Sequence, residues 1–279
     1  MKQFYPNRFK DKVIILTGAA RGIGEATAIR AAKEGAKLVL ADRLKEEGER
    51  VLNAVRAEGG TAIFLNLDLS AEEHAEQMVD AAVKTYGHLD IAINNAGVMG
   101  NPSPLHELEQ EQMDYTMANN FYSVFFCCKH EIREFMKEGN GGVIVNNASI
   151  AGLTGLPGNP AYVASKHAVN GLTKNLALDY ARYGIRINSV NPAGTTTPMV
   201  AEAYEYVKNH REAAIKAGMD PAKAQSMAGQ KLTSMLEREA TAEEQAASIL
   251  FLVSDDATHM TGATVQTDCL LYTSPSPRD

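Results

Sequence analysis

A tyrosine and a lysine, Tyr162 and Lys166, stand four residues apart in a segment whose pattern predicts a helix. This spacing places both side chains on one face of the helix. A free tyrosine has a pKa near ~10, so it needs a downward shift of roughly 3 units to act as a base at neutral pH. A cation ~5 Å away contributes roughly 3 kcal/mol toward that shift at an effective dielectric constant near ~20. The pair can therefore exchange a proton with an alcohol or its ketone.

A serine completes this candidate site. Ser149 lies 13 residues before Tyr162, at the end of an apolar, β-rich run. Ligands of open α/β sheets bind beyond the carboxyl ends of the strands, and a hydroxyl group there can hold a substrate oxygen and stabilise developing charge. A Tyr-x-x-x-Lys pair or a strand-end serine alone is common in ordinary structure, but their combination at this spacing favours catalysis of hydride transfer.

The segment TGAARGIG, residues 17–24, joins a predicted strand to a predicted helix. Glycines in such a turn let the backbone approach a pyrophosphate, and the helix N-terminus offers free N–H groups and a positive dipole end. A glycine-rich turn by itself is weak evidence, but here the strand, the helix and a downstream acidic residue are all present. We expect the pyrophosphate of a dinucleotide to contact Gly18, Arg21, Gly22, Ile23 and Gly24.

That acidic residue is Asp42, which ends the second predicted strand, 24 residues after Gly18. A carboxylate at this position accepts hydrogen bonds from the adenosine ribose hydroxyls and repels the 2′-phosphate of NADP. Arg21 and Arg43 are nearby cations of the kind that holds a 2′-phosphate. We give the carboxylate more weight than the arginines and predict NAD as the cofactor.

Apolar, β-rich runs alternate with helical patterns along the whole chain. The runs cover residues 13–17, 37–42, 62–68, 90–95, 142–149, 185–191 and 263–268, and helices are expected near 22–34, 44–58, 71–86, 111–138, 160–183 and 242–253. Nearly continuous apolar strands separated by helices are typical of a parallel sheet covered on both faces. The sequence therefore predicts an α/β fold, a doubly wound parallel sheet of about seven strands (a Rossmann fold).

Residues 1–268 contain no repeat, linker or low-complexity segment, so we expect one dinucleotide-binding and catalytic domain there. Residues 269–279, CLLYTSPSPRD, fit no packing pattern. We interpret them as a non-native tail produced by read-through of a sequencing adapter, with a natural proline-rich tail as the alternative.

Composition and charge exclude several classes of protein. The net charge of −7 argues against a nucleic-acid partner, and no apolar run approaches the ~18 residues of a membrane span. The N-terminus has no signal-peptide pattern, and the three cysteines fit neither a disulfide framework nor a zinc site. No His/Asp/Glu cluster has metal-ligand spacing. We expect a cytoplasmic protein without a bound metal.

Three motifs, residues 17–24, NNAG at 94–97 and YVASK at 162–166, occur in the order and spacing of the short-chain dehydrogenase/reductase family. The chain resembles this family over residues 10–268. The resemblance implies an NAD-dependent oxidoreductase that moves a hydride between NAD(H) and a secondary alcohol or its ketone. It implies four catalytic residues: Asn120, Ser149, Tyr162 and Lys166. Asn119 is the second candidate for the asparagine, which would hold a water in a proton relay.

The resemblance also implies further cofactor contacts. Asp68 and Leu69 are expected at the adenine, Asn95 near the ribose, and Tyr162 and Lys166 at the nicotinamide end. The loop of residues 192–197 is expected to grip the carboxamide through Pro192, Thr195 and Thr197. Ala193 departs from the family, which usually has glycine after the loop proline, and this puts the backbone geometry of the loop in question.

The insertion of residues 198–237 is expected to form a lid over the substrate. Its methionines and tyrosines are Met199, Tyr204, Tyr206, Met219, Met227 and Met235. Methionine fills apolar gaps flexibly, so they favour an apolar or alicyclic substrate such as a steroid-like alcohol, although helix packing explains each equally well. Leu153, Leu156 and Pro157 are expected in the opposite wall. The alternatives are an NADPH-dependent 3-ketoacyl-thioester reductase of the same fold and a non-catalytic cofactor-binding sensor.

Members of the family typically form dimers or tetramers. The predicted helix near 111–138 carries more apolar surface than one core-facing stripe needs, in Phe121, Val124, Phe125, Phe126 and Cys128. We expect a homotetramer, with a homodimer as the second choice.

Overall fold

The computed structural model describes residues 5–220 and 235–269 of the chain. Within them, seven strands form one parallel sheet in the order β3-β2-β1-β4-β5-β6-β9. The strands are β1 (Val13–Thr17), β2 (Lys37–Asp42), β3 (Thr61–Asn66), β4 (Ile91–Asn94), β5 (Gly142–Asn147), β6 (Ile185–Pro192) and β9 (Thr264–Thr267). The doubly wound sheet predicted from the alternating apolar runs is confirmed.

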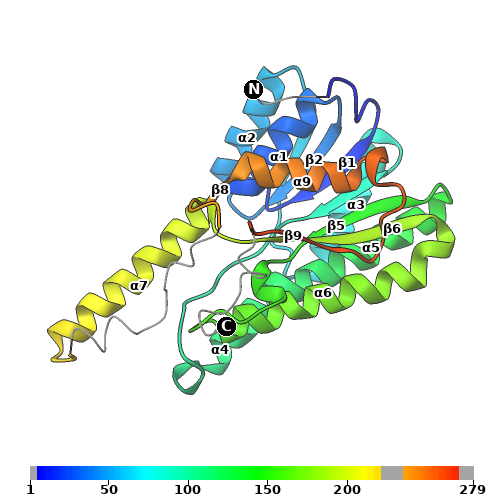
Figure 1. Cartoon of the computed structure of the whole chain (residues 1–279). Helices are drawn as coiled ribbons and strands as arrows, with labels where there is room; N and C mark the ends of the chain where they lie inside the picture. Colours follow the sequence, from blue (N-terminus) through cyan, green and yellow to red (C-terminus); the bar gives the residue numbers. More distant parts are fainter. Residues whose placement is uncertain (1–4, 221–234, 270–279) are drawn as a thin grey trace.

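Helices cover both faces of this sheet (Figure 1). One face is covered by α1 (Gly22–Lys33), α2 (Lys45–Ala57) and α9 (Ala242–Val253), which share one apolar cluster with the strands. The other face is covered by α3 (Glu72–Tyr86), α5 (Ser123–Glu138) and α6 (Pro160–Tyr180), which form a second cluster. Because both faces are packed, every residue of β1 is buried, and the strand sequence is apolar without alternation.

The sequence order of the strands reverses beside β1, which has β2 on one side and β4 on the other. The crossovers that leave β1 and β4 therefore run in opposite directions. At such a point the loops after the two strands separate, and a crevice opens beyond their carboxyl ends. The glycine-rich turn follows β1 and the asparagine pair ends β4, so both motifs lie at this crevice.

The helical stretch expected over residues 111–138 is divided into three parts. A π-helical turn over residues 118–122 separates α4 (Gln110–Met117) from α5. A π-turn adds a residue to one helical turn and so changes which side chains face inward, often at a functional site. Here Asn120 is completely buried, while Asn119 is only half-buried.

The insertion after β6 extends away from the body of the fold. Two short strands, β7 (Thr195–Thr196) and β8 (Ala240–Thr241), pair in parallel at its base. From there α7 (Pro198–Lys216) projects outward from the sheet (Figure 1). The buried residue of α7 is Val207, in the middle of the helix.

One carboxyl group is enclosed between α5 and the sheet. Glu131 is 0% exposed, and its Oε2 accepts a hydrogen bond of 3.0 Å from Nδ2 of Asn94. Burial raises the pKa of Glu131 to about 8, because the charged form loses its hydration, and the hydrogen bond from Asn94 opposes this shift.

In the described part of the chain, no helix combines the length and the apolar character needed to cross a membrane.

Candidate active site

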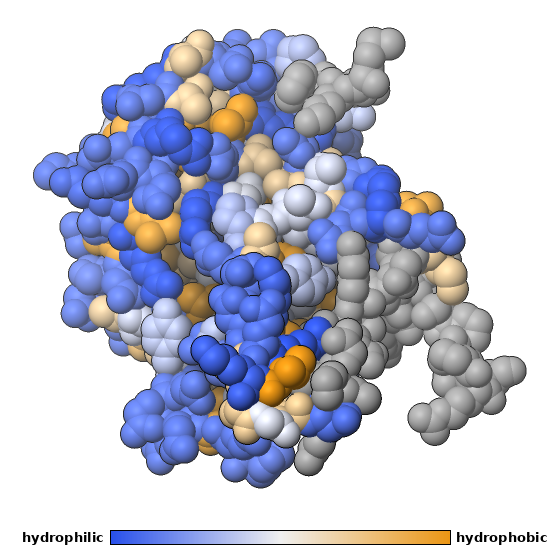
Figure 2. Space-filling model, turned by 90° about the vertical axis from the view of Figure 1, so that its left-hand side faces the viewer, coloured by the Kyte–Doolittle hydropathy of each residue, from blue (hydrophilic) through white to orange (hydrophobic). Residues whose placement is uncertain are grey.

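A cavity of about 580 Å³ opens beyond the carboxyl ends of the strands. Its volume is within the usual range for small-molecule sites. Figure 2, seen from the side of α7, shows a mostly hydrophilic surface with apolar and weakly polar residues around a central hollow. The residues predicted for the site that line the cavity are Gly18, Arg21, Gly22, Ile23, Asp42, Asp68, Leu69, Asn95, Ser149, Tyr162, Lys166, Pro192, Thr195 and Thr197. Two others, Gly24 and Asn120, are not among the lining residues and act from behind the wall.

The glycine-rich turn is shaped by contacts that exclude side chains. Gly18 and Gly22 have φ angles of 62° and 56°, in the left-handed region that favours glycine. A Cβ at Gly24 would lie 1.9 Å from the carbonyl oxygen of Gly18, so α1 can pack this closely against the turn only with glycine there. The free N–H groups at the start of α1 consequently face the cavity. This is a cradle that fits a pyrophosphate.

Asp42 is held rigidly at the mouth of this cradle. Its Oδ2 accepts a hydrogen bond of 2.9 Å from the Ala20 N–H, and its Oδ1 accepts one of 3.0 Å from the Leu44 N–H. The carboxylate therefore bridges the loops that follow β1 and β2. Its remaining lone pairs border the cavity, where they can accept hydrogen bonds from ribose hydroxyls.

The two nearby arginines already have partners. Arg43 donates to the Tyr115 hydroxyl at 3.1 Å and to Oδ1 of Asn119 at 3.3 Å. Arg21 forms an ion pair of 2.6 Å with Glu202 of α7. Tyr115 could not be predicted as a wall of this subsite, because α4 is separated from β2 by more than 60 residues.

Asn95 and its neighbour on β5 link the strands under the cavity. The side-chain Nδ2 of Asn95 donates to the carbonyl oxygens of Thr17 and Gly18, and its Oδ1 accepts a bond of 2.7 Å from Nδ2 of Asn147. Asn95 thus fixes the glycine-rich turn as well as lining the cavity. Sequence reasoning missed Asn147, although an asparagine at the end of a buried strand is a signal that could have found it.

The two residues expected at the adenine follow β3. Asp68 accepts hydrogen bonds from the N–H and hydroxyl groups of Ser70 at 3.0 and 2.8 Å. Burial favours a higher pKa for Asp68, but the hydrogen bonds from Ser70 outweigh it and hold the pKa below its usual value. Leu69 is 5% exposed and offers an apolar edge to the cavity.

Ser149, Tyr162 and Lys166 converge at the inner end of the cavity, and all three are buried. The Ser149 hydroxyl accepts a hydrogen bond of 3.1 Å from the Ala151 N–H, which orients it beyond β5. Lys166 donates from Nζ to the carbonyl oxygen of Asn147 at 2.9 Å, and its Nζ lies 5.7 Å from the centre of the Tyr162 ring. Tyr162 and Lys166 share one face of α6, as the spacing predicts.

The pKa of Tyr162 shifts in the direction opposite to the one expected from its spacing to Lys166. Burial raises the pKa of Tyr162, opposed by a hydrogen bond with Ser149, and burial lowers the pKa of Lys166 to about 8. Loss of hydration disfavours the charged form of both groups, and the spacing of Tyr162 and Lys166 along the helix does not reveal this cost. The lowered pKa expected for Tyr162 is therefore wrong, because burial raises it instead.

Asn120 lies directly behind the lysine. Its Oδ1 accepts a bond of 2.7 Å from the Val98 N–H, and its Nδ2 donates to the Ser165 hydroxyl at 3.0 Å. A Cβ placed on Gly97 would be 3.0 Å from Asn120 Oδ1 and 3.3 Å from Lys166 Nζ, so the two groups flank the same small space. Asn119 instead faces Arg43, which distinguishes the two candidates by geometry.

The loop after β6 closes the cavity on the side of the insertion. Thr197 caps α7 by accepting a bond from the Val200 N–H, and Thr195 is buried with its hydroxyl donating to the Ala193 carbonyl oxygen at 2.9 Å. Ala193 is not among the described non-glycine residues with positive φ, so its methyl group fits the loop without strain. The departure from glycine therefore leaves the loop geometry intact.

The insertion contributes part of the outer wall. Of its methionines and tyrosines, Met199, Tyr204 and Tyr206 line the cavity, Met219 and Met235 do not, and Met227 lies outside the described residues. Leu156 lines the opposite wall, as expected, whereas Leu153 and Pro157 do not line the cavity. The substrate end of the cavity is therefore partly apolar.

The apolar surface expected on α5 is smaller than predicted. Val124 and Cys128 are 2% and 1% exposed and belong to the core, so the prediction was wrong for them. Phe121, Phe125 and Phe126 form a set of ring contacts with Tyr122, and Phe125 is 39% exposed.

Within residues 5–220 and 235–269, no group of three or more His, Cys, Asp or Glu side chains is arranged to hold a metal ion.

The strand order, the glycine-rich turn beside the point of reversal and the carboxylate ending β2 together define a dinucleotide-binding protein of the doubly wound class.

Comparisons with known proteins agree. The family model for short chain dehydrogenases matches residues 12–208. The 3beta-hydroxysteroid dehydrogenase of Mediterraneibacter gnavus is 42% identical over 267 residues, 95% of this chain and 96% of that protein. The cyclohexanol dehydrogenase of an Acinetobacter species is 37% identical over 265 residues, 94% of this chain and 96% of that protein. A solved short chain dehydrogenase from Mycobacterium paratuberculosis, bound to NAD, is 26% identical with a TM-score of 0.85, covering 96% of this chain and 100% of that one.

The chain belongs to the short chain dehydrogenase family. It is an oxidoreductase that acts on CH–OH groups.

Proposed function

We propose that this enzyme uses NAD in preference to NADP to interconvert an apolar cyclic secondary alcohol and its ketone. The observation that carries the proposal is the convergence of Ser149, Tyr162 and Lys166 at the inner end of a cavity whose outer end carries Asp42. NAD, when bound, supplies the hydride acceptor and a positive ring next to the tyrosine.

The protein's own residues handle the proton. Ser149 holds the substrate oxygen through its hydroxyl, which the Ala151 N–H orients. Tyr162 takes the alcohol proton or returns it to the ketone. The hydrogen bond with Ser149 opposes the burial that raises the pKa of Tyr162, and the Lys166 ammonium, 5.7 Å from the ring centre, is placed to favour the phenolate. Asn120 positions the proton relay behind the lysine.

The preference for NAD rests on the fixed carboxylate. Asp42 is held by two backbone N–H groups, while Arg43 and Arg21 are bonded to Tyr115 and Glu202. A 2′-phosphate would therefore meet a negative charge that cannot turn away. A related solved structure is described as bound to NAD.

The substrate class is inferred from the walls of the cavity and from the relatives. Met199, Leu156, Tyr204 and Tyr206 supply apolar surface around the substrate end. Two relatives are named for a hydroxysteroid and for cyclohexanol. The exposed aromatic side chains of Tyr122 and Phe125, at the start of α5, support assembly into a homotetramer.

The test is a panel of cyclic and acyclic secondary alcohols and their ketones, assayed with NAD(H) and NADP(H) at the nicotinamide absorbance. We expect kcat/KM to be highest for cyclic substrates with NAD(H). Preference for NADPH with 3-ketoacyl thioesters would instead support a 3-ketoacyl-thioester reductase. No turnover with any combination of substrate and cofactor would support a non-catalytic cofactor-binding sensor.

A further inference from the structure

Gln245 occupies a position on α9 at which the helix packs against the body of the protein. It is 1% exposed, four residues before the buried Ile249 and seven before the buried Leu252. An apolar side chain would satisfy this packing, whereas a buried amide is costly unless its polar atoms are hydrogen-bonded. The reason for a glutamine here must therefore lie in what its amide contacts.

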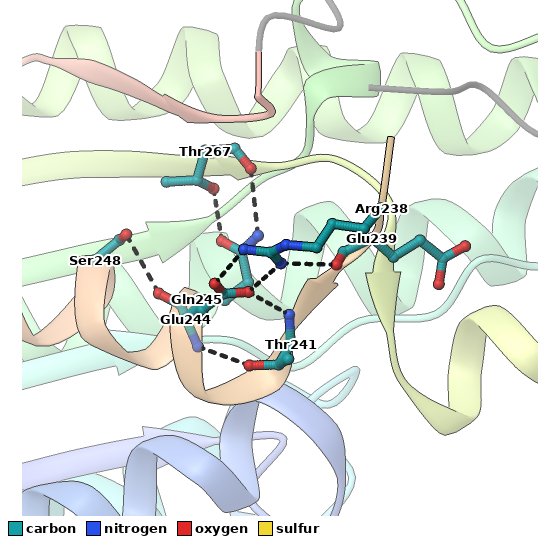
Figure 3. A network of polar contacts seen from close by, with 7 residues as sticks. All are labelled: Arg238, Glu239, Thr241, Glu244, Gln245, Ser248 and Thr267. Atoms are coloured by element: carbon teal, nitrogen blue, oxygen red, sulfur yellow. Dashed lines mark hydrogen bonds and ion pairs between the residues drawn. The ribbon is translucent and has the colours of Figure 1, made fainter. Parts of the chain in front are cut away.

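The amide of Gln245 joins two separate segments. Its Nε2 donates to the Thr195 hydroxyl and to the Thr267 carbonyl oxygen, both at 3.3 Å, and its Oε1 accepts a bond of 2.6 Å from the Thr267 hydroxyl. Figure 3 shows the two bonds between Gln245 and Thr267 at the N-terminal end of α9. The side chain thus connects α9 to the last strand of the sheet and to the loop after β6.

That loop is the one proposed to hold the nicotinamide end of the cofactor. Thr195 lines the cavity and is 3% exposed, and its hydroxyl accepts the hydrogen bond from Gln245. Its hydroxyl also donates to the Ala193 carbonyl oxygen, and the Ala193 N–H donates to the Thr267 carbonyl oxygen at 3.5 Å. Residues 193 and 195 are therefore tied to a common anchor behind the cavity wall.

The start of α9 is itself fixed by the returning end of the insertion. Arg238 donates to both oxygens of Glu244 at 2.8 and 2.7 Å, and the Thr241 N–H donates to Glu244 Oε2 at 2.8 Å (Figure 3). Thr241 and Glu244 also form a capping box. Because Glu244 immediately precedes Gln245, these bonds hold the glutamine in one position.

We propose that Gln245 is a positioning residue for the cofactor, which acts through Thr195 to fix the loop of residues 192–197. The inference rests on the proposed role of that loop. The amide touches neither cofactor nor substrate, and its loss leaves the glycine-rich turn and Asp42 unchanged. Its effect is therefore confined to the nicotinamide half of NAD.

The test compares two ligands that differ only in that half. Binding of NADH and of ADP-ribose, which lacks the nicotinamide, is measured for the full chain and for Gln245→Leu. Loss of the amide bonds is expected to weaken NADH binding by about tenfold and to change ADP-ribose binding less than about twofold. The KM for NAD should rise and kcat should fall in parallel with NADH affinity.

Two matched variants control for general damage to α9. Ser248→Ala removes a hydroxyl that bonds only weakly, at 3.5 Å, to the backbone of the same helix, and it should leave both affinities unchanged. Thr267→Val removes the donor to Gln245 Oε1 and should reproduce the selective loss, whereas Thr267→Ser keeps the hydroxyl and should restore NADH binding.

Equal losses of NADH and ADP-ribose affinity, or no loss of either, in both Gln245→Leu and Thr267→Val would overturn the proposal. Should Gln245→Leu fail to fold, the Thr267 pair decides the question by itself. Failure of the proposed function has a different signature, because it would appear in the unmodified chain, as no turnover with any alcohol or ketone or as a preference for NADPH over NADH.

Discussion

Removing the negative charge of Asp42 should shift the enzyme from NAD toward NADP. The carboxylate borders the cavity and is fixed by the Ala20 and Leu44 N–H groups, so it cannot move away from a 2′-phosphate. At ~5 Å and an effective dielectric constant near ~20, two unit charges repel by roughly 3 kcal/mol. Salt and solvent reach this open end of the cavity and reduce the repulsion to about 1.4–2.8 kcal/mol, which is worth tenfold to a hundredfold in specificity.

Two substitutions separate the charge from the structural role of the side chain. Asp42→Ser keeps a hydroxyl that can accept one of the backbone hydrogen bonds, so the ratio of kcat/KM for NAD to that for NADP should fall by one to two orders of magnitude. Asp42→Ala leaves both N–H groups without this acceptor and should also reduce turnover with NAD.

The matched control is Glu46→Ser, which removes a carboxylate four residues away on α2 that does not line the cavity. The assay is initial rate at the nicotinamide absorbance, at fixed ionic strength, with both cofactors. Equal use of NAD and NADP by the unmodified enzyme, or an equal shift in Glu46→Ser, would refute the reasoning.

Three further changes have defined outcomes. Tyr162→Phe should lower kcat by about 10²–10⁴-fold while NADH affinity, followed by fluorescence, stays near normal; a variant that kept more than about a tenth of the rate would contradict the acid–base role. Glu131→Gln should flatten the pH dependence of unfolding, because the folded pKa of about 8 exceeds the unfolded value near ~4.3. The stability that the neutral acid contributes is complete below pH ~4 and is lost as pH rises toward 8. The free energy of unfolding of the variant, measured by urea titration, should therefore rise relative to that of the wild type between pH 5 and 8. A constant difference between the two proteins over this range would contradict the prediction. Light scattering should give a tetramer that weakens in Phe125→Ser; a monomeric wild-type protein would contradict the assembly proposal.

The sequence alone determined the sheet, because both faces of each strand are buried and the apolar runs need no knowledge of their neighbours to be recognised. It also determined the glycine-rich turn, since Gly18 and Gly22 occupy backbone conformations that other residues avoid. Local chemistry was likewise sufficient to pair Tyr162 with Lys166, because their spacing on one helix decides which side chains share a face.

Only the tertiary structure decided features that depend on contacts between distant segments. The resemblance to the family already favoured Asn120 over Asn119, but the π-helical turn that places Asn120 behind the lysine is one that no helical periodicity anticipates. Burial raised the pKa of Tyr162, because hydration is lost through surrounding elements that spacing along one helix does not reveal. Gln245 has the sequence position of a core residue, and its role emerged only when β9 and the loop after β6 met its amide.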